Sequence, residues 1–249
     1  MKYFLKRMIL ILPYGIRKRF LKKYALRYSM VEALQHLKDV CFSPDIVIDV
    51  GTAGGTPAIL SVFRKAFYIW IEPLKEFEEK IIKLQKKFKG EYIIAAAGSK
   101  PGTATINIHQ DLVGSSLLNE VDGSSADGIP REVEVVTVDS LIDKYAINKG
   151  ATIFLKLDVQ GFEIEVLEGS KKLLEFCEAI MLEVSMFKFQ KHAPDFYDIV
   201  VYMKKIGFVA YDIFDGLNRP LDNALAQKDI LFVKEEGIFR QSHEFSGRN

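Results

Sequence analysis

Cysteine is scarce in this chain and follows no metal-binding or disulfide pattern. Cys41 and Cys177 are the two cysteines among 249 residues, and they lie in apolar or helical contexts without C-x-x-C spacing. This argues against the disulfide framework of small secreted domains and against a zinc site. We expect both to be reduced core residues of a cytoplasmic protein.

Long hydrophobic runs are also lacking. The apolar residues 8–12 are too few to span a bilayer, and Pro13, Tyr14 and Gly15 interrupt them. No longer apolar core followed by a small-residue cleavage site marks a signal peptide. The sequence therefore predicts neither a membrane-spanning segment nor a secreted precursor.

Residues 1–31 contain no acidic residue and nine Lys or Arg. The net charge of the whole chain is only +1, so the excess of basic residues is confined to this part. Apolar residues alternate with these charges, so residues 1–27 are interpreted as a segment that rests on an anionic membrane surface, at the inner face of the membrane. Helices packed on the domain with a solvated basic face are an alternative. A nucleic-acid contact is a third, disfavoured one, and we expect no nucleic-acid partner.

The remaining chain has the size and composition of one folded domain. With 49% apolar residues, the chain can bury a substantial core as a single α/β unit. We expect a basic helical extension at residues 1–31, the domain at 32–236 and a polar, frayed tail at 237–249.

The rest of the chain is organised around residues 45–55, an apolar β-branched run that ends in an acid and then in glycines. Such a run is typical of the first parallel strand in a sheet covered on both faces. Gly51, Gly54 and Gly55 predict a turn with positive φ or close ligand approach, leading into a helix at residues 58–63. An ordinary strand-to-helix loop with incidental glycines is the alternative.

A second apolar run, residues 66–71, ends in Glu72, which follows Asp49 by 23 residues. In a nucleotide-binding βαβ unit, an acid about 20 residues past the glycine turn binds the two ribose hydroxyls of the ligand. Ala53 stands where the dinucleotide pattern G-x-G-x-x-G needs its second glycine, so a pyrophosphate would fit poorly. An adenosyl ligand without phosphates fits better, which predicts S-adenosylmethionine as the cofactor.

Further strands and helices complete the predicted fold. Small residues at the end of the third strand would let an adenine ring lie close to the backbone. We predict a doubly wound, mostly parallel seven-stranded sheet of the Rossmann-like methyltransferase type, ending in an antiparallel pair. The further strands are expected at residues 92–97, 152–158, 179–183, 208–214 and 229–233, and the further helices at 28–39, 74–84, 163–168 and 196–205. The expected cofactor-binding residues are Asp49, Gly51, Thr52, Gly54, Gly55, Glu72, Pro73 and Ala97.

Residues 98–140 depart from the alternation of strands and helices. Two β segments, 103–108 and 132–137, flank a polar stretch at 110–131 that is rich in Gly, Ser and Asp. Long irregular loops in compact domains are usually functional or mobile, so this insert is predicted to form part of a substrate cleft or lid. A disordered surface loop is the alternative.

Four predicted strands end in a carboxylate. Because ligands bind at the carboxyl ends of strands in open α/β sheets, we expect these side chains to line one crevice. They are Asp49, Glu72, Asp158 and Glu183.

Several of these blocks, in this order, resemble the FkbM-type S-adenosylmethionine-dependent methyltransferases. The resemblance covers about residues 45–234, and its most specific block includes Leu157-Asp158-Val159-Gln160-Gly161. It implies methyl transfer to a hydroxyl, often on a sugar or another secondary metabolite. The other matching blocks are residues 47–55, 71–73, 114–117 and 136–141.

Methyl transfer requires in-line alignment of acceptor oxygen, methyl and sulfur, and an aliphatic hydroxyl also needs a base. The candidates are Asp158, Glu183 and His109, with His192 a weaker one. A divalent ion held by the strand-end acids is an alternative way to acidify the hydroxyl, but no His/Asp cluster at ligand spacing supports it, so we predict no metal.

Two other classes stay open. A nicotinamide-dependent oxidoreductase of the same βαβ type is disfavoured by the missing G-x-G-x-x-G pattern. A non-catalytic, membrane-associated binding module that keeps the fold is the other. We expect a small-molecule or glycan acceptor as the partner of an O-methyltransferase.

Overall fold

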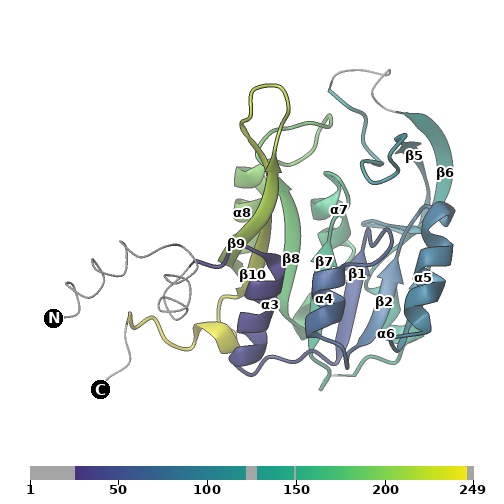
Figure 1. Cartoon of the computed structure of the whole chain (residues 1–249). Coiled ribbons are helices and arrows are strands. Elements are labelled where there is room, and N and C mark those ends of the chain that lie inside the picture. Colours follow the sequence, from purple (N-terminus) through teal and green to yellow (C-terminus); the bar gives the residue numbers. More distant parts are fainter. Residues whose placement is uncertain (1–25, 122–127, 149, 246–249) are drawn as a thin grey trace.

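The computed structural model describes residues 26–121, 128–148 and 150–245 (Figure 1). The predicted basic extension therefore lies outside the described residues, except for residues 26–31. Within the described ranges, no helix is both long enough and apolar enough to cross a membrane.

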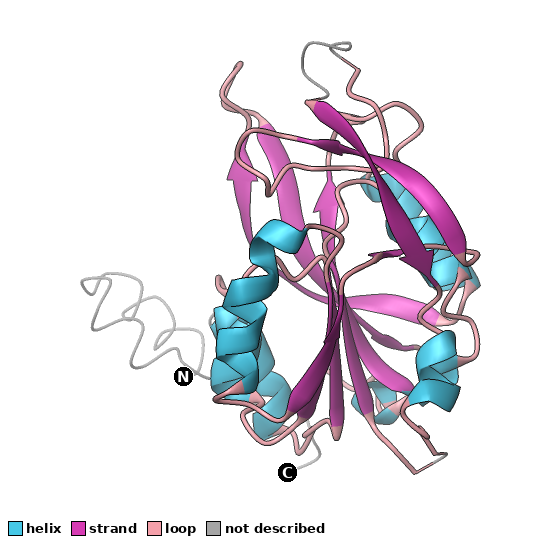
Figure 2. Cartoon of the chain, turned by 90° about the vertical axis from the view of Figure 1, so that its right-hand side faces the viewer, coloured by secondary structure: helices cyan, strands magenta, loops and turns pink. Residues whose placement is uncertain are grey.

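A seven-stranded sheet forms the centre of the molecule, with the strand order β3-β2-β1-β7-β8-β10-β9 (Figures 1 and 2). The first five strands in this order pair in parallel, and β10 pairs antiparallel with both β8 and β9. This confirms the predicted sheet and its antiparallel end. The strands are β1 (Ile46–Val50), β2 (Phe67–Ile71), β3 (Gly90–Ile93), β7 (Ile153–Leu157), β8 (Cys177–Ser185), β9 (Phe208–Asn218) and β10 (Leu225–Lys234).

Helices cover both faces of this sheet, as Figure 2 shows. One buried cluster joins residues of α3, α4 and α5 to one face of the strands, and a second joins residues of α6, α7 and α8 to the other. The α-helices are α3 (Met30–Asp39), α4 (Pro57–Val62), α5 (Glu78–Gln85), α6 (Ser140–Lys144), α7 (Glu163–Glu168) and α8 (Phe196–Lys205), and three short 3₁₀ segments are η1 (Lys75–Phe77), η2 (Leu173–Phe176) and η3 (Ile238–Arg240). The doubly wound architecture follows from this division, because each strand alternates its buried side chains between the two clusters.

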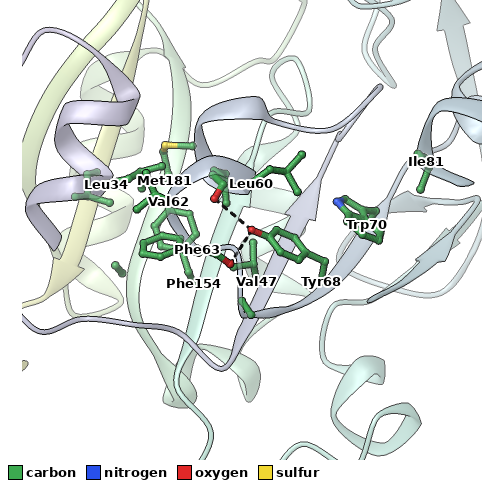
Figure 3. Packing of buried hydrophobic residues seen from close by; sticks show 14 of the residues in the cluster. Leu34, Val47, Leu60, Val62, Phe63, Tyr68, Trp70, Ile81, Phe154 and Met181 are labelled. Carbon is green, nitrogen blue, oxygen red and sulfur yellow. Dashed lines mark hydrogen bonds between the residues drawn. The ribbon is translucent and has the colours of Figure 1, made fainter. Parts of the chain in front are cut away.

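A buried tyrosine anchors α4 to β2 (Figure 3). The Tyr68 hydroxyl donates hydrogen bonds to the carbonyls of Ile59 at 3.2 Å and Phe63 at 3.1 Å, and its ring stacks on Trp70 with the centroids 5.2 Å apart. These contacts fix the end of α4 against β2, in addition to the bonds that the two carbonyls accept from the amides of Phe63 and Ala66. The helix that follows the glycine turn is therefore attached to the sheet at its C-terminal end.

The predicted third strand at residues 92–97 is divided in the structure. The chain leaves the main sheet after β3 and joins a second sheet of order β4-β6-β5, made of β4 (Ala96–Ala97), β5 (Gly102–Ile108) and β6 (Ile129–Val136). Ala96 and Ala97 pair in parallel with Val135 and Val136. The division arises because β2 ends at Ile71, opposite Ile93, so the alanines find their backbone partners in the insert.

The C-terminal segment differs from the predicted frayed tail. Residues 238–240 form η3, and the ring of Phe239 packs on Phe42 and Tyr211 at centroid distances of 5.4 and 5.6 Å. Phe239 helps to attach this segment to the core, because aromatic pairs gain energy from both burial and geometry, and the Ile238 amide also donates to Glu178.

Candidate functional site

The turn between β1 and α4 has the backbone geometry that its glycines predict. Gly51 and Gly55 take φ values of +68° and +91°, and a Cβ added at Gly51 would lie 1.8 Å from the carbonyl oxygen of Asp158. Gly51 therefore allows the turn to pass directly beside the end of β7. Only glycine combines this φ with this close approach.

Asp49 stabilises the same turn through side-chain hydrogen bonds. Its Oδ2 accepts hydrogen bonds from the hydroxyls of Thr52 at 2.9 Å and Thr56 at 3.0 Å, and its side chain is almost fully buried. Asp49 does not line the cavity described below, contrary to the prediction that all four strand-end acids would do so. The reason is that its side chain points towards the α4 face of the sheet, where the two threonines lie.

Glu72 follows β2 and is held by backbone donors. Its Oε2 accepts from the Ala53 amide at 2.7 Å and its Oε1 from the Leu74 amide at 3.0 Å. Burial raises the pKa of Glu72 to about 7, although both backbone bonds and the Lys156 charge act in the opposite direction. The carboxylate therefore has a fixed orientation between the glycine turn and the next segment.

A cavity of about 260 Å³ opens between these elements at the carboxyl ends of the strands, close to the lower end of the range for small-molecule sites. The glycine turn and Glu72 form one side, and apolar residues from η1, β4 and the insert form much of the rest. Gly51, Thr52, Gly55, Glu72, Pro73, Ala97 and Asp158, all predicted site residues, line it, together with residues that include Phe77, Ile106, Leu112, Leu117, Lys156 and Gln160.

Lys156 is the cation in this lining, and its ammonium group is paired with other residues of the protein. Nζ donates to the Gly51 carbonyl at 3.0 Å and lies 3.2 Å from Asp49 Oδ1 and 3.3 Å from Asp158 Oδ2. Burial disfavours the charge, but the two carboxylates outweigh it and raise the pKa of Lys156 well above its usual range. Lys156 is therefore a permanent cation within a set of acids.

Further carboxylates lie beyond Asp158 in the direction of β10. The Gln160 amide donates to Asp158 Oδ1 at 2.9 Å and to Glu183 Oε2 at 2.8 Å, and the Gln227 amide donates to the same Glu183 oxygen at 2.9 Å. Asp229 pairs directly across from Glu183 in the β8–β10 ladder. Burial, and then neighbouring negative charge, raises the pKa of Glu183 to about 8 and that of Asp229 to about 7.

The insert is tied to the turn after β7. Gln160 has a φ of +51°, and its carbonyl accepts a hydrogen bond of 2.7 Å from the Ser116 hydroxyl. From the other side, buried Glu163 accepts from the amides of Val159 at 3.4 Å and Gly161 at 3.1 Å. The insert thus supplies both a wall of the cavity and a support for the residue that joins the two acids.

Two predicted histidines lie outside the cavity lining. His109 follows β5 and places Nε2 3.7 Å from Glu120 Oε1, with 22% of its side chain exposed. His192 is exposed in the loop after β8. Gly54 and Glu183 also do not contact the cavity: a Cβ at Gly54 would meet the Lys80 side chain, and Glu183 lies behind Gln160.

Sequence reasoning missed four polar residues of this site. Lys156 offered a signal, because it is a single charge inside the buried run of β7. Gln160 offered one as well, because it lies in the most specific block of the family resemblance. Gln227 and Asp229 offered none, since only the folded sheet places them beside Glu183.

Among the described residues, no group of three or more His, Cys, Asp or Glu side chains is arranged to hold a metal ion. The cavity fits an adenosyl ligand through Glu72, whose carboxylate can accept ribose hydroxyls, and through the apolar wall near Ala97. Since the Lys156 charge is neutralised by Asp49 and Asp158, this lining offers no free cation for a pyrophosphate. S-adenosylmethionine therefore suits these residues better than a dinucleotide does.

Comparison with protein families matches residues 49–210 to the methyltransferase FkbM domain. No curated protein matches the chain. Among solved structures, similar ones include magnesium protoporphyrin IX methyltransferase from Synechocystis PCC 6803 with bound S-adenosylmethionine, at 12% identity, 82% coverage of this chain, 76% of that one and a TM-score of 0.45. Another is an rRNA methylase from Streptococcus thermophilus, at 12% identity, 84% and 99% coverage and a TM-score of 0.43. At these scores, neither likeness supports an argument about function.

Proposed function

Because the chain belongs to the methyltransferase FkbM domain family, we propose that it methylates a hydroxyl group of a sugar, a glycan or a related metabolite. The chain is an S-adenosylmethionine-dependent methyltransferase. Membership of the family does not identify the methyl acceptor. The residues around Asp158 support a hydroxyl group as the acceptor.

The observation that carries this proposal is the position of Asp158. Its carboxylate lines the cavity with 30% of the side chain exposed, while Lys156 and Gln160 hold one oxygen each. An aliphatic hydroxyl becomes a useful nucleophile only as its proton leaves, so a base must stand within reach of the reacting oxygen. Each carboxylate oxygen keeps a free lone pair with which Asp158 can accept that proton.

The neighbouring groups suit an acceptor with several hydroxyls. Gln160, Glu183, Gln227 and Asp229 gather carboxylate and amide groups beside Asp158, and such groups bind hydroxyls as donors and acceptors. In this proposal Asp158 orients the reacting hydroxyl and takes its proton. Glu183 acts mainly on the binding of the acceptor.

The residues on the other side of the cavity hold the methyl donor. Glu72 accepts hydrogen bonds from the ribose hydroxyls, and Gly51, Thr52 and Gly55 let the turn backbone approach the ligand, with Asp49 and Gly54 supporting the turn. Pro73 and Ala97 contribute to the wall for the adenine ring. When bound, S-adenosylmethionine supplies an electrophilic methyl group.

Two measurements test this function. Calorimetric titration with S-adenosylmethionine and with NAD should give binding of the former only, whereas binding of NAD alone would favour a nicotinamide-dependent oxidoreductase. A screen of glycans and small hydroxylated metabolites with labelled methyl donor should then give label on an acceptor oxygen. Cofactor binding without transfer to any acceptor would favour a non-catalytic binding module.

We also propose that residues 1–27 hold the enzyme on an anionic membrane surface in the cytoplasm. The chain is fixed to β9 where this segment ends, since the Arg27 guanidinium pairs with Asp212 and the carbonyl of the next residue, Tyr28, accepts from the Asp215 amide at 3.0 Å. The full chain should sediment with anionic vesicles at low salt and dissociate as salt rises, because such attraction is screened over about 10 Å at 0.1 M.

A chain that begins at Leu26 keeps the contacts with β9 and is the matched control. It should stay in solution at both salt concentrations and still bind cofactor. A full-length protein that ignores the vesicles, or a shortened one that unfolds, would favour helices packed on the domain.

A further inference from the structure

Lys156 is a buried charge that takes no direct part in the proposed proton and methyl transfer. Its side chain is 7% exposed, and the other residues of β7 are buried and apolar. Taking an ammonium out of water is costly, so such a group persists only where its partners are well placed. The partners of Lys156 belong to two different parts of the site.

The first set of partners is the turn that faces the methyl donor. Nζ donates to the Gly51 carbonyl at 3.0 Å and lies 3.2 Å from Asp49 Oδ1, while Asp49 Oδ2 holds the hydroxyls of Thr52 and Thr56. Asp49 and Lys156 are also register partners in the β1–β7 ladder. The ammonium therefore fixes the orientation of the Gly51 peptide and, through Asp49, of the two threonines.

The second partner is the carboxylate that faces the acceptor. Asp158 Oδ2 lies 3.3 Å from Nζ, and its other oxygen is joined through the Gln160 amide to Glu183. The Lys156 charge also lowers the pKa of Glu72, Glu183 and Asp229, against the larger effect of their burial. One ammonium thus influences the carboxylates on both sides of the cavity.

We propose that Lys156 is a positioning residue for methyl transfer, which holds the glycine turn and the Asp158 carboxylate in one fixed relation so that donor and acceptor meet in line. This inference rests on the proposed function, because it assigns the acceptor to the Asp158 side. Positioning of this kind matters because a displacement of about 1 Å at the reacting atoms can cost about 100-fold in rate.

A methionine at this position would fill a similar volume but leave Asp49 and Asp158 without the cation between them. In Lys156→Met we expect the dissociation constant of S-adenosylmethionine to rise about tenfold or more, since a charge-assisted hydrogen bond to the turn is lost. We expect kcat to fall about 100-fold. The NMR titration midpoint of the Glu183 carboxyl should rise by about one pH unit, because a nearby cation is removed.

Two variants separate positioning from folding. Lys234→Met is the matched control, because this lysine lies in β10, donates to the Glu175 carbonyl at 2.7 Å and approaches Glu178. It should leave all three measurements within about twofold, or 0.3 pH unit, of the wild type. The double variant Asp49→Asn/Lys156→Met removes the uncompensated buried acid and should fold, yet it should keep the low kcat and the raised Glu183 midpoint.

Recovery of wild-type kcat and cofactor affinity in the folded double variant would overturn the proposal and leave Lys156 a structural role. Cofactor affinity and carboxyl titration need no acceptor, so they test Lys156 even if no hydroxyl is methylated. Wild-type protein that binds S-adenosylmethionine but methylates no hydroxyl would instead count against the proposed function alone.

Discussion

Glu72 is a buried carboxylate and Glu183 a half-buried one, both near strand ends, and they are held by different kinds of partner. Glu72 receives two backbone amides, and burial raises its pKa to about 7. Glu183 receives two side-chain amides, and burial together with the charges of Asp158 and Asp229 raises its pKa to about 8. Backbone donors fix a carboxylate, whereas side-chain amides can turn and neighbouring acids can change charge. The first arrangement suits recognition of a constant cofactor, and the second suits an acceptor that loses a proton.

Both carboxylates affect the pH dependence of stability in the same direction. Their folded-state pKa values lie above the ordinary value of 4.5, so the folded chain binds more protons than the unfolded chain between these values. Stability contributed by these groups is therefore fully present below about pH 4.5 and falls as pH rises through about 7 to 8. The ligand-free protein should lose stability over this window.

The largest expected effect is on the cofactor side. Glu72→Ala should weaken S-adenosylmethionine binding by about 2–4 kcal/mol, since each hydrogen bond to a charged acceptor contributes about 1.5–3 kcal/mol. Calorimetry at pH 8, where Glu72 is ionised, measures this loss, and wild-type affinity should itself decrease as pH falls through about 7. Glu76→Ala is the control, because Glu76 pairs with Arg131 and does not line the cavity. Unchanged affinity in a folded Glu72→Ala protein would remove the ribose assignment.

The next effect tests whether the acceptor side acts on rate rather than on cofactor binding. Asp158→Asn keeps the shape of the side chain, so cofactor affinity should stay within a few fold while turnover falls about 100-fold or more. Single-turnover kinetics with saturating cofactor separate the two quantities, and Asp143→Asn on the exposed side of α6 serves as control. Loss of cofactor binding with a normal rate in the bound complex would make Asp158 a cofactor ligand and direct attention to His109 as the base.

A smaller effect is expected one strand further away. Glu183→Gln retains an oxygen that can accept from Gln160 and Gln227, but it loses the charge. The acceptor KM should rise about tenfold, with kcat reduced less, because the lost interaction acts on binding more than on the transition state. Glu178→Gln, in the same strand and paired with Lys234, should change neither constant. A larger loss in kcat than in KM would show that Glu183 takes part in the proton transfer.

The smallest effect concerns stability. Burial, the charge of Asp158 and that of Asp215 raise the pKa of Asp229 to about 7, so ionised Asp229 destabilises the folded state above that pH. Asp229→Asn should raise the free energy of unfolding by about 1 kcal/mol at pH 8 and change it little near pH 4. Urea denaturation at both pH values measures the difference. Equal effects at pH 4 and pH 8 would mean that charge is not the cause.

More residues of the proposed cofactor side than of the proposed acceptor side could be predicted from the sequence, for a physical reason. Gly51 and Glu72 belong to one βαβ unit, in which a tight turn and an acid about 20 residues later are linked by local chain geometry. Asp229 and Gln227 reach Glu183 only because β10 pairs antiparallel with β8, more than 40 residues away. Such long-range pairs leave no local pattern that sequence spacing could show.

The sequence by itself determined the apolar strands, their combination into a mostly parallel sheet and the glycine turn, because these depend on periodicity and on backbone freedom at single residues. The tertiary structure alone decided which strand-end acids reach the cavity. Asp49 is turned towards Thr52 and Thr56, whereas Asp158 stays beside the cavity, and Lys156 lies between them. Charge pairing across neighbouring strands sets these orientations, and a buried cation takes the place between two acids only when the folded sheet brings them to within hydrogen-bond distance.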